Sequence, residues 1–95
     1  MTRQQHLIAI LGEEGVEVSQ RTTKALRFGL NEVQPEQPFD NAERIMREMS
    51  DMIAVYEMLV DEGLVPPVKK SLIQNKKDKV EKFLVYSDEQ GMITK

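Results

Sequence analysis

The sequence predicts an all-α protein built from three long amphipathic helices. Apolar side chains recur every three or four residues in three separate segments, which is the spacing of one face of an α-helix. Segments containing proline and glycine separate these helices, and no stretch shows the polar–apolar alternation of a strand. Because the chain has 95 residues, we expect a single domain over residues 1–95.

The first helix is expected from about Gln4 to Leu30, with Gly29 and Asn31 at the position of a C-cap. Residues 31–40 contain two prolines and are expected to form a loop. The apolar stripe of this helix consists of Leu7, Ile8, Ile10, Leu11, Val18, Ala25, Leu26 and Phe28.

The second helix is expected to begin with Asp40 or Asn41 as its N-cap and to end at Gly63. The third is expected from Pro67, since proline suits the first helical position, to about Tyr86. The apolar face of the second helix contains Ile45, Met49, Met52, Ile53, Tyr56, Leu59 and Val60, and the residues expected to point inward from the third are Leu72, Ile73, Val80, Phe83 and Leu84.

Three helices barely enclose a core, and a chain of this length buries little apolar surface by itself. The six methionines suit irregular gaps between helices. We therefore expect two or more copies of the chain to pair and to complete a helical bundle.

The composition excludes several kinds of site. With no cysteine and the single histidine His6, the chain has no disulfide, zinc–thiolate site, cysteine nucleophile or pair of imidazole ligands. The net charge of −3 argues against non-specific binding of nucleic acid, which favours a basic surface. Because the chain shows neither a secretory signal nor an apolar run of transmembrane length, we expect a cytoplasmic protein that does not bind membranes.

Four acidic residues lie on or beside the apolar faces of the first two helices. Glu14 falls inside the first stripe with Glu17 at its edge, and Glu48 lies in register with the second stripe, with Asp51 three residues later. Four converging carboxylates repel one another unless cations lie between them, so we expect a site for Mg²⁺, or for Mn²⁺, which takes the same ligands. Either pair alone also occurs by chance on solvated helices, and a di-iron bundle would need a Glu-x-x-His motif that the chain lacks.

The third helix carries lysines on or near its apolar face. Lys76 lies near the centre of the stripe and Lys79 at its edge, with Asn75 one turn before Lys79. A lysine that points inward is expected to pair with an anion, either the acidic residues or a bound triphosphate. The alternative is that its aliphatic stem carries the ammonium group to the surface. Arg21, inside the first stripe, either pairs with the nearby glutamates or contacts substrate.

The two acidic motifs resemble those of the MazG-like all-α nucleoside triphosphate pyrophosphohydrolases. The first motif of that family, Glu-Glu-x-x-Glu, matches Glu13-Glu14-Gly15-Val16-Glu17, and the second, Glu-x-x-Asp, matches Glu48-Met49-Ser50-Asp51. The lysine-bearing segment 76–87 is similar to the third helix of small phage and bacterial members. The likeness spans about residues 7–91.

This resemblance implies a magnesium-dependent hydrolase that cleaves the α–β phosphoanhydride of an NTP or dNTP, releasing the monophosphate and pyrophosphate. It implies a homo-oligomer, dimer or tetramer, whose active site is partly built from neighbouring chains. It also implies metal ligation by the residues at positions 14, 17, 48 and 51, while Glu13 either lies in the outer coordination shell or helps to bind a further ion or the attacking water. The chain lacks the aromatic-rich base pocket of some members: before the third helix, the residues suited to stacking on a base are Phe28, Phe39 and Tyr56.

Lys76 and Lys79 are expected to stabilise charge on the leaving pyrophosphate as point charges, with Asn75 adding a neutral hydrogen bond. Two other functions fit the same sequence. A phosphoribosyl-ATP pyrophosphohydrolase shares the superfamily architecture, and a non-catalytic helical interaction module would show exposed acidic faces and no dependence on metal.

Overall fold

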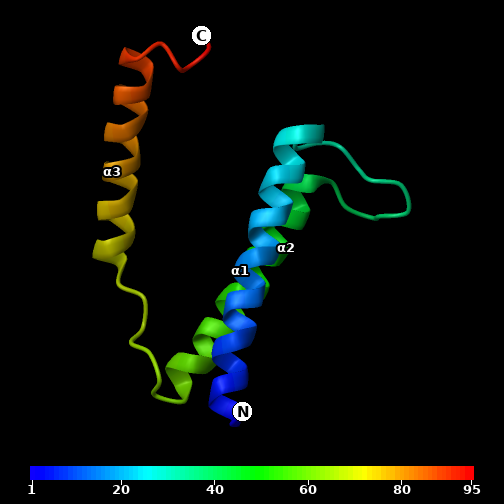
Figure 1. The fold of residues 1–95 in the computed structure, drawn as a ribbon, viewed down its shortest axis with the longest axis vertical. Helices are drawn as coiled ribbons and strands as arrows, with labels where there is room; N and C mark the ends of the chain where they lie inside the picture. Colours follow the sequence, from blue (N-terminus) through cyan, green and yellow to red (C-terminus); the bar gives the residue numbers. More distant parts are fainter.

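The computed structural model describes residues 1–95 as three α-helices without strands, which confirms the all-α prediction (Figure 1). Helix α1 spans Arg3–Phe28, α2 spans Asn41–Asp61 and α3 spans Lys70–Glu89. Helices α1 and α2 pack side by side as an antiparallel hairpin, whereas no Cα atom of α3 lies within 8 Å of either. The three helices therefore share no core within one chain.

Local capping interactions fix the ends of the hairpin helices. The Thr2 hydroxyl accepts a hydrogen bond from the backbone N–H of Gln5 at 3.1 Å, and the Gln5 side chain accepts from the N–H of Thr2 at 2.9 Å. Gly29, with a φ of +100°, ends α1 as predicted. Of the two expected N-caps of α2, Asp40 fills the position, because its carboxylate accepts from the N–H of Glu43 at 2.9 Å.

Asn41 is fully buried and ties the interhelical loop to the end of the hairpin. Its side-chain Nδ2 donates to the carbonyl of Gly29 and to the carboxylate of Glu32, both at 2.9 Å. Its backbone N–H donates to the carbonyl of Glu32 at 3.1 Å. The sequence pattern indicated Asn41 only as a cap, because hydrogen bonds to a returning loop leave no periodic signal.

The predicted ends of the third helix were wrong on both sides. Helix α3 begins at Lys70 rather than at Pro67, since residues 66–69 are not helical and Lys69 is the extended N-cap. The hydroxyl of Tyr56 donates to the carbonyl of Pro66 at 2.6 Å and holds this linker against α2. At the other end, the helix continues until Gly91 adopts a φ of +72°.

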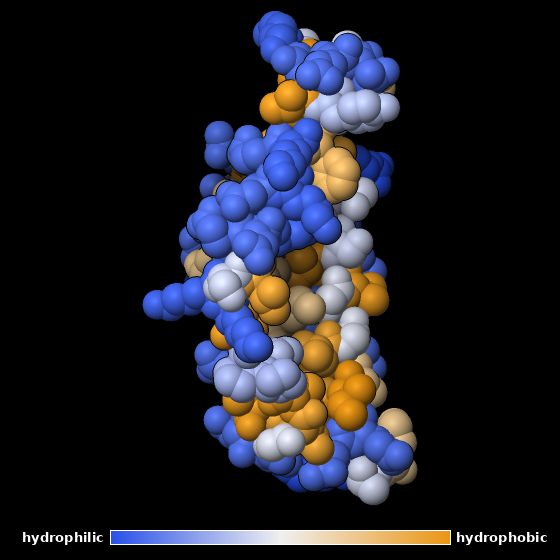
Figure 2. Space-filling model, turned by 90° about the vertical axis from the view of Figure 1, so that its left-hand side faces the viewer, coloured by the Kyte–Doolittle hydropathy of each residue, from blue (hydrophilic) through white to orange (hydrophobic).

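The buried apolar residues all lie between α1 and α2, and they are Leu7, Ala25 and Leu59. The prediction that the stripe of α3 points inward is wrong within one chain, since Val80 is 40% exposed and Phe83 61%. In Figure 2, apolar side chains are exposed below and beside the hydrophilic outer side of α3. The first stripe was also predicted too wide, because a single partner helix leaves its outer members exposed, namely Ile8, Leu26 and Phe28.

None of the three helices combines the length and the apolar character that crossing a bilayer requires.

Candidate metal centre

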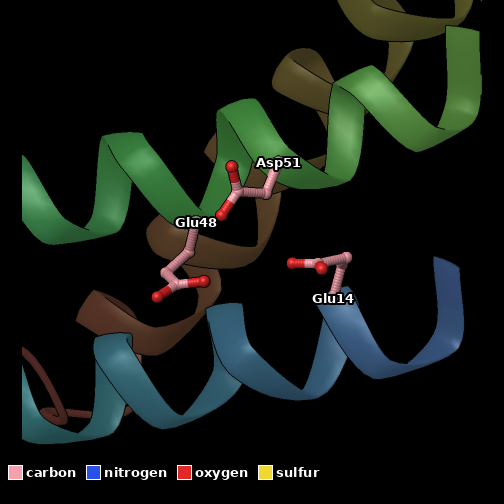
Figure 3. Close-up of side chains that lie close together, drawn as sticks. All are labelled: Glu14, Glu48 and Asp51. Carbon is pink, nitrogen blue, oxygen red and sulfur yellow. The ribbon is translucent and has the colours of Figure 1, made fainter. Parts of the chain in front are cut away.

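Three carboxylates meet between α1 and α2. Glu14 comes from α1, whereas Glu48 and Asp51 come from consecutive turns of α2. Each offers one oxygen, and these oxygens lie within 4.8 Å of one another. Figure 3 shows the side chain of Glu14 directed across the gap toward the two acids of α2. We call these three residues the acidic cluster.

The electrostatics of the acidic cluster act most strongly on Glu14. Partial burial, followed by the negative charge of Asp51 and then of Glu48, Glu17 and Glu13, raises the pKa of the Glu14 carboxyl. Glu17, the fourth expected ligand, and Glu13 are both exposed and lie outside the group of three. They are near enough to add repulsion, which a cation between the carboxylates would relieve.

The donor set fits a hard divalent cation. It consists of carboxylate oxygens only, which suits Mg²⁺ and Mn²⁺ and does not select between them. No basic side chain neutralises the acidic cluster, because the salt bridges of the chain lie elsewhere: Arg3–Glu62, Arg47–Glu43 and Lys95–Asp88. The three carboxylates therefore have no lysine or arginine side chain of this chain as a salt-bridge partner.

Arg21 is buried in the seam between the helices, as its place in the stripe predicted. Its side chain follows Glu14 by two turns on the same face of α1, and the residue is 7% exposed. Its Nε and Nη1 atoms are buried without a hydrogen-bond partner, so the expected alternative of pairing with a glutamate does not occur. Because an unpaired buried donor is costly, Arg21 is the group in this seam with the greatest need of an anion.

The structure does not bring the residues of α3 to the acidic cluster. Asn75, Lys76 and Lys79 are exposed on a helix that has no Cα atom within 8 Å of the hairpin. The acidic cluster and α3 also lie on different sides of α2. At 100° per residue, Ile53 lies about 160° around α2 from Asp51. Ile53 lines the groove that opens toward the linker and α3, so the acids open on the opposite face of the hairpin.

The aromatic residues considered for stacking on a base each have a partner already. The guanidinium of Arg47 lies over the ring of Phe39, 3.8 Å from its centroid, and that of Arg27 lies 4.9 Å from the centroid of Phe28. Tyr56 donates its hydroxyl proton to the linker.

Comparisons of the chain with protein-family models, with curated proteins and with solved structures find no match.

Proposed function

We propose that the protein is a magnesium-dependent nucleoside triphosphate pyrophosphohydrolase of the MazG-like type. Its reaction would be hydrolysis of the α–β phosphoanhydride of an NTP or dNTP to the monophosphate and pyrophosphate. One observation carries the proposal: Glu14, Glu48 and Asp51, which belong to the two motifs, place carboxylate oxygens within 4.8 Å of one another.

In this proposal the acidic cluster holds the ion, and Glu17 joins it through a change of side-chain rotamer. A bound divalent ion supplies charge neutralisation of the triphosphate and a coordinated water of lowered pKa. Glu13, on the exposed side of α1, orients the attacking water or holds a further ion. Burial, and then repulsion from the neighbouring acids, raises the pKa of Glu14, which supports metal binding by the acidic cluster, since a cation stabilises the ionised carboxylates.

Arg21 is the best supported of the proposed substrate contacts. Its unpartnered Nε and Nη1 atoms would bind a phosphate oxygen as charge-assisted donors. The proposed contacts of Asn75, Lys76 and Lys79 with the leaving pyrophosphate require α3 to reach the acidic face from a different position. Arg21 lies on the same helix as Glu14, two turns away, and needs no movement of α3.

We also propose that the working unit is a homo-oligomer, a dimer or a tetramer, that completes the helical bundle. Three buried apolar residues make a small core for 95 residues. Large apolar side chains remain exposed together along α3 and its linker, among them Val68 at 60% and Leu72 at 61%. Apolar surface of this kind marks sites of association.

The test is product release from the common NTPs and dNTPs and from phosphoribosyl-ATP, with and without millimolar Mg²⁺. We expect magnesium-dependent release of pyrophosphate together with the nucleoside monophosphate. Turnover restricted to phosphoribosyl-ATP would assign the chain to the related pyrophosphohydrolases. Absence of turnover, together with a melting temperature that does not respond to Mg²⁺, would instead favour a non-catalytic interaction module.

A further inference from the structure

An apolar groove runs along the face of the hairpin opposite the acidic cluster. Leu11 of α1 and Met49, Ile53 and Tyr56 of α2 line it, and the linker closes one side together with Ile73 in the first turn of α3. Two acidic residues of α2, Glu57 and Asp61, also line it. The groove therefore offers an apolar surface with negative charge along it.

Helix α3 has the properties of an occupant for this groove. Its 20 residues make a helix of about 30 Å, nearly the length of the 21-residue α2. Leu72, Val80 and Phe83 form an exposed stripe on it, and Lys76 lies on the same side. Charges are complementary, because the groove carries two acidic residues, Glu57 and Asp61, whereas the first half of α3 carries four lysines and one aspartate.

The linker keeps α3 out of register with its own hairpin. Two prolines hold the linker extended, and the hydrogen bond from Tyr56 to Pro66 ties it to α2. In Figure 1, α3 begins beside the middle of the hairpin and runs past its far end. The groove lies in the other half, near Leu11 of α1 and Val60 of α2. If α3 closed sideways, Val80 and Phe83 would therefore lie beyond the groove.

We propose that α3 of a second copy of this chain lies lengthwise in the groove and that the exchange is reciprocal, so that two chains form a twofold symmetric dimer. Lys76 then faces Glu57 and Asp61 of the other chain, so in this dimer it is an interface residue and Arg21 remains as the proposed phosphate contact. The acidic cluster stays open on the opposite face. This inference rests on the proposed homo-oligomer and is independent of the proposed reaction.

The first experiment measures mass in solution by light scattering at micromolar concentration. The wild type is expected at twice the single-chain mass of 10.9 kDa. Val80→Asp places a charge in the stripe and should give the single-chain mass. Val85→Asp makes the same change about 140° away around α3 and should leave the dimer intact. A monomeric wild type, or equal dissociation of the two variants, would overturn the proposal.

The second experiment establishes which chain supplies the helix, and it uses the absence of cysteine from the sequence. A tagged Ile53→Cys chain is mixed and equilibrated with an untagged Val80→Cys chain and treated with a short bismaleimide. We expect a covalent heterodimer, whereas Val85→Cys in place of Val80→Cys should give little product. The double variant Ile53→Cys/Val80→Cys should likewise cross-link between chains.

Cross-linking of the double variant mainly within one chain would show that α3 closes on its own hairpin, and it would overturn the exchange. So would the lack of any covalent heterodimer. Neither measurement involves nucleotide or metal, so either failure would leave the proposed hydrolysis untouched.

Discussion

The hairpin and α3 differ in what each needs in order to be ordered. Helices α1 and α2 cover one another and bury Leu7, Ala25 and Leu59, whereas α3 also carries an apolar stripe but buries none of its residues. Most of the stability of a protein helix comes from packing its apolar face. The hairpin therefore defines the candidate metal centre with residues of one chain, while α3 depends on a surface that its own chain does not bring to it.

This contrast separates the proposed site of chemistry from the proposed site of association. The acids lie where two helices of one chain meet, so their geometry should survive dissociation of an oligomer. The apolar stripe of α3 lies on the helix that has no partner within one chain. Substitutions in this stripe should therefore affect oligomerisation. The following predictions test that separation, from the largest expected effect to the smallest.

Glu48→Gln should reduce turnover about 1,000-fold, which corresponds to roughly 4 kcal/mol in activation free energy. The change removes one ionised oxygen donor from the acidic cluster and preserves the shape of the side chain. Steady-state pyrophosphate release measures the effect, with circular dichroism to confirm that the helices remain. Glu43→Gln is the matched control, since Glu43 lies on the same helix and contacts Arg47 on the surface. Near-normal activity of Glu48→Gln would rule out the assigned centre.

Leu59→Ala should lower the free energy of unfolding by about 2–5 kcal/mol, because Leu59, near the C-terminal end of α2, is 1% exposed. Leu72→Ala, on α3, should cost below about 0.5 kcal/mol at protein concentrations where the chain is monomeric. Urea unfolding at several protein concentrations measures both. If α3 packs against a second chain, the cost of Leu72→Ala should rise with concentration. Equal costs at all concentrations would contradict the contrast between the two regions.

Arg21→Met should raise KM for the nucleotide about tenfold, or about 1.4 kcal/mol, and leave the melting temperature unchanged or higher. The reason is that Arg21 is buried with two unpaired nitrogens, and an apolar side chain of similar length removes this cost. Lys24→Met, one turn further along α1, is the control. A fall in melting temperature with an unchanged KM would show that Arg21 is structural.

The metal-free protein should lose stability as the pH rises above the ordinary glutamate pKa of 4.5 toward the raised pKa of Glu14. In that interval the folded state binds the Glu14 proton more tightly than the unfolded state does. The contribution of protonated Glu14 to the free energy of unfolding is therefore complete below the interval and lost above it. Thermal unfolding at a series of pH values measures the change. Glu14→Gln should remove this dependence, Glu89→Gln should not, and millimolar Mg²⁺ should offset the loss at neutral pH. An identical pH profile for wild type and Glu14→Gln would contradict repulsion within the acidic cluster.

The sequence by itself determined the three helices and the faces they present. Periodicity, the N-cap Asp40 and the left-handed glycines act within a few residues, so their effects can be predicted locally. The inward placement of Glu14 and Arg21 also follows from helix geometry, because 100° per residue fixes the direction of each side chain. The acidic motifs were visible for the same reason.

Only the tertiary structure decided which acids meet and where α3 lies. Asp51 joins the acidic cluster and Glu17 does not, because the antiparallel register of α1 and α2 sets which turns face one another. The linker between α2 and α3 is fixed by the hydrogen bond from Tyr56 to Pro66, a contact between segments that no periodic pattern records. A stripe shows that a helix needs a partner, but the partner is chosen by long-range packing, and within one chain α3 has none.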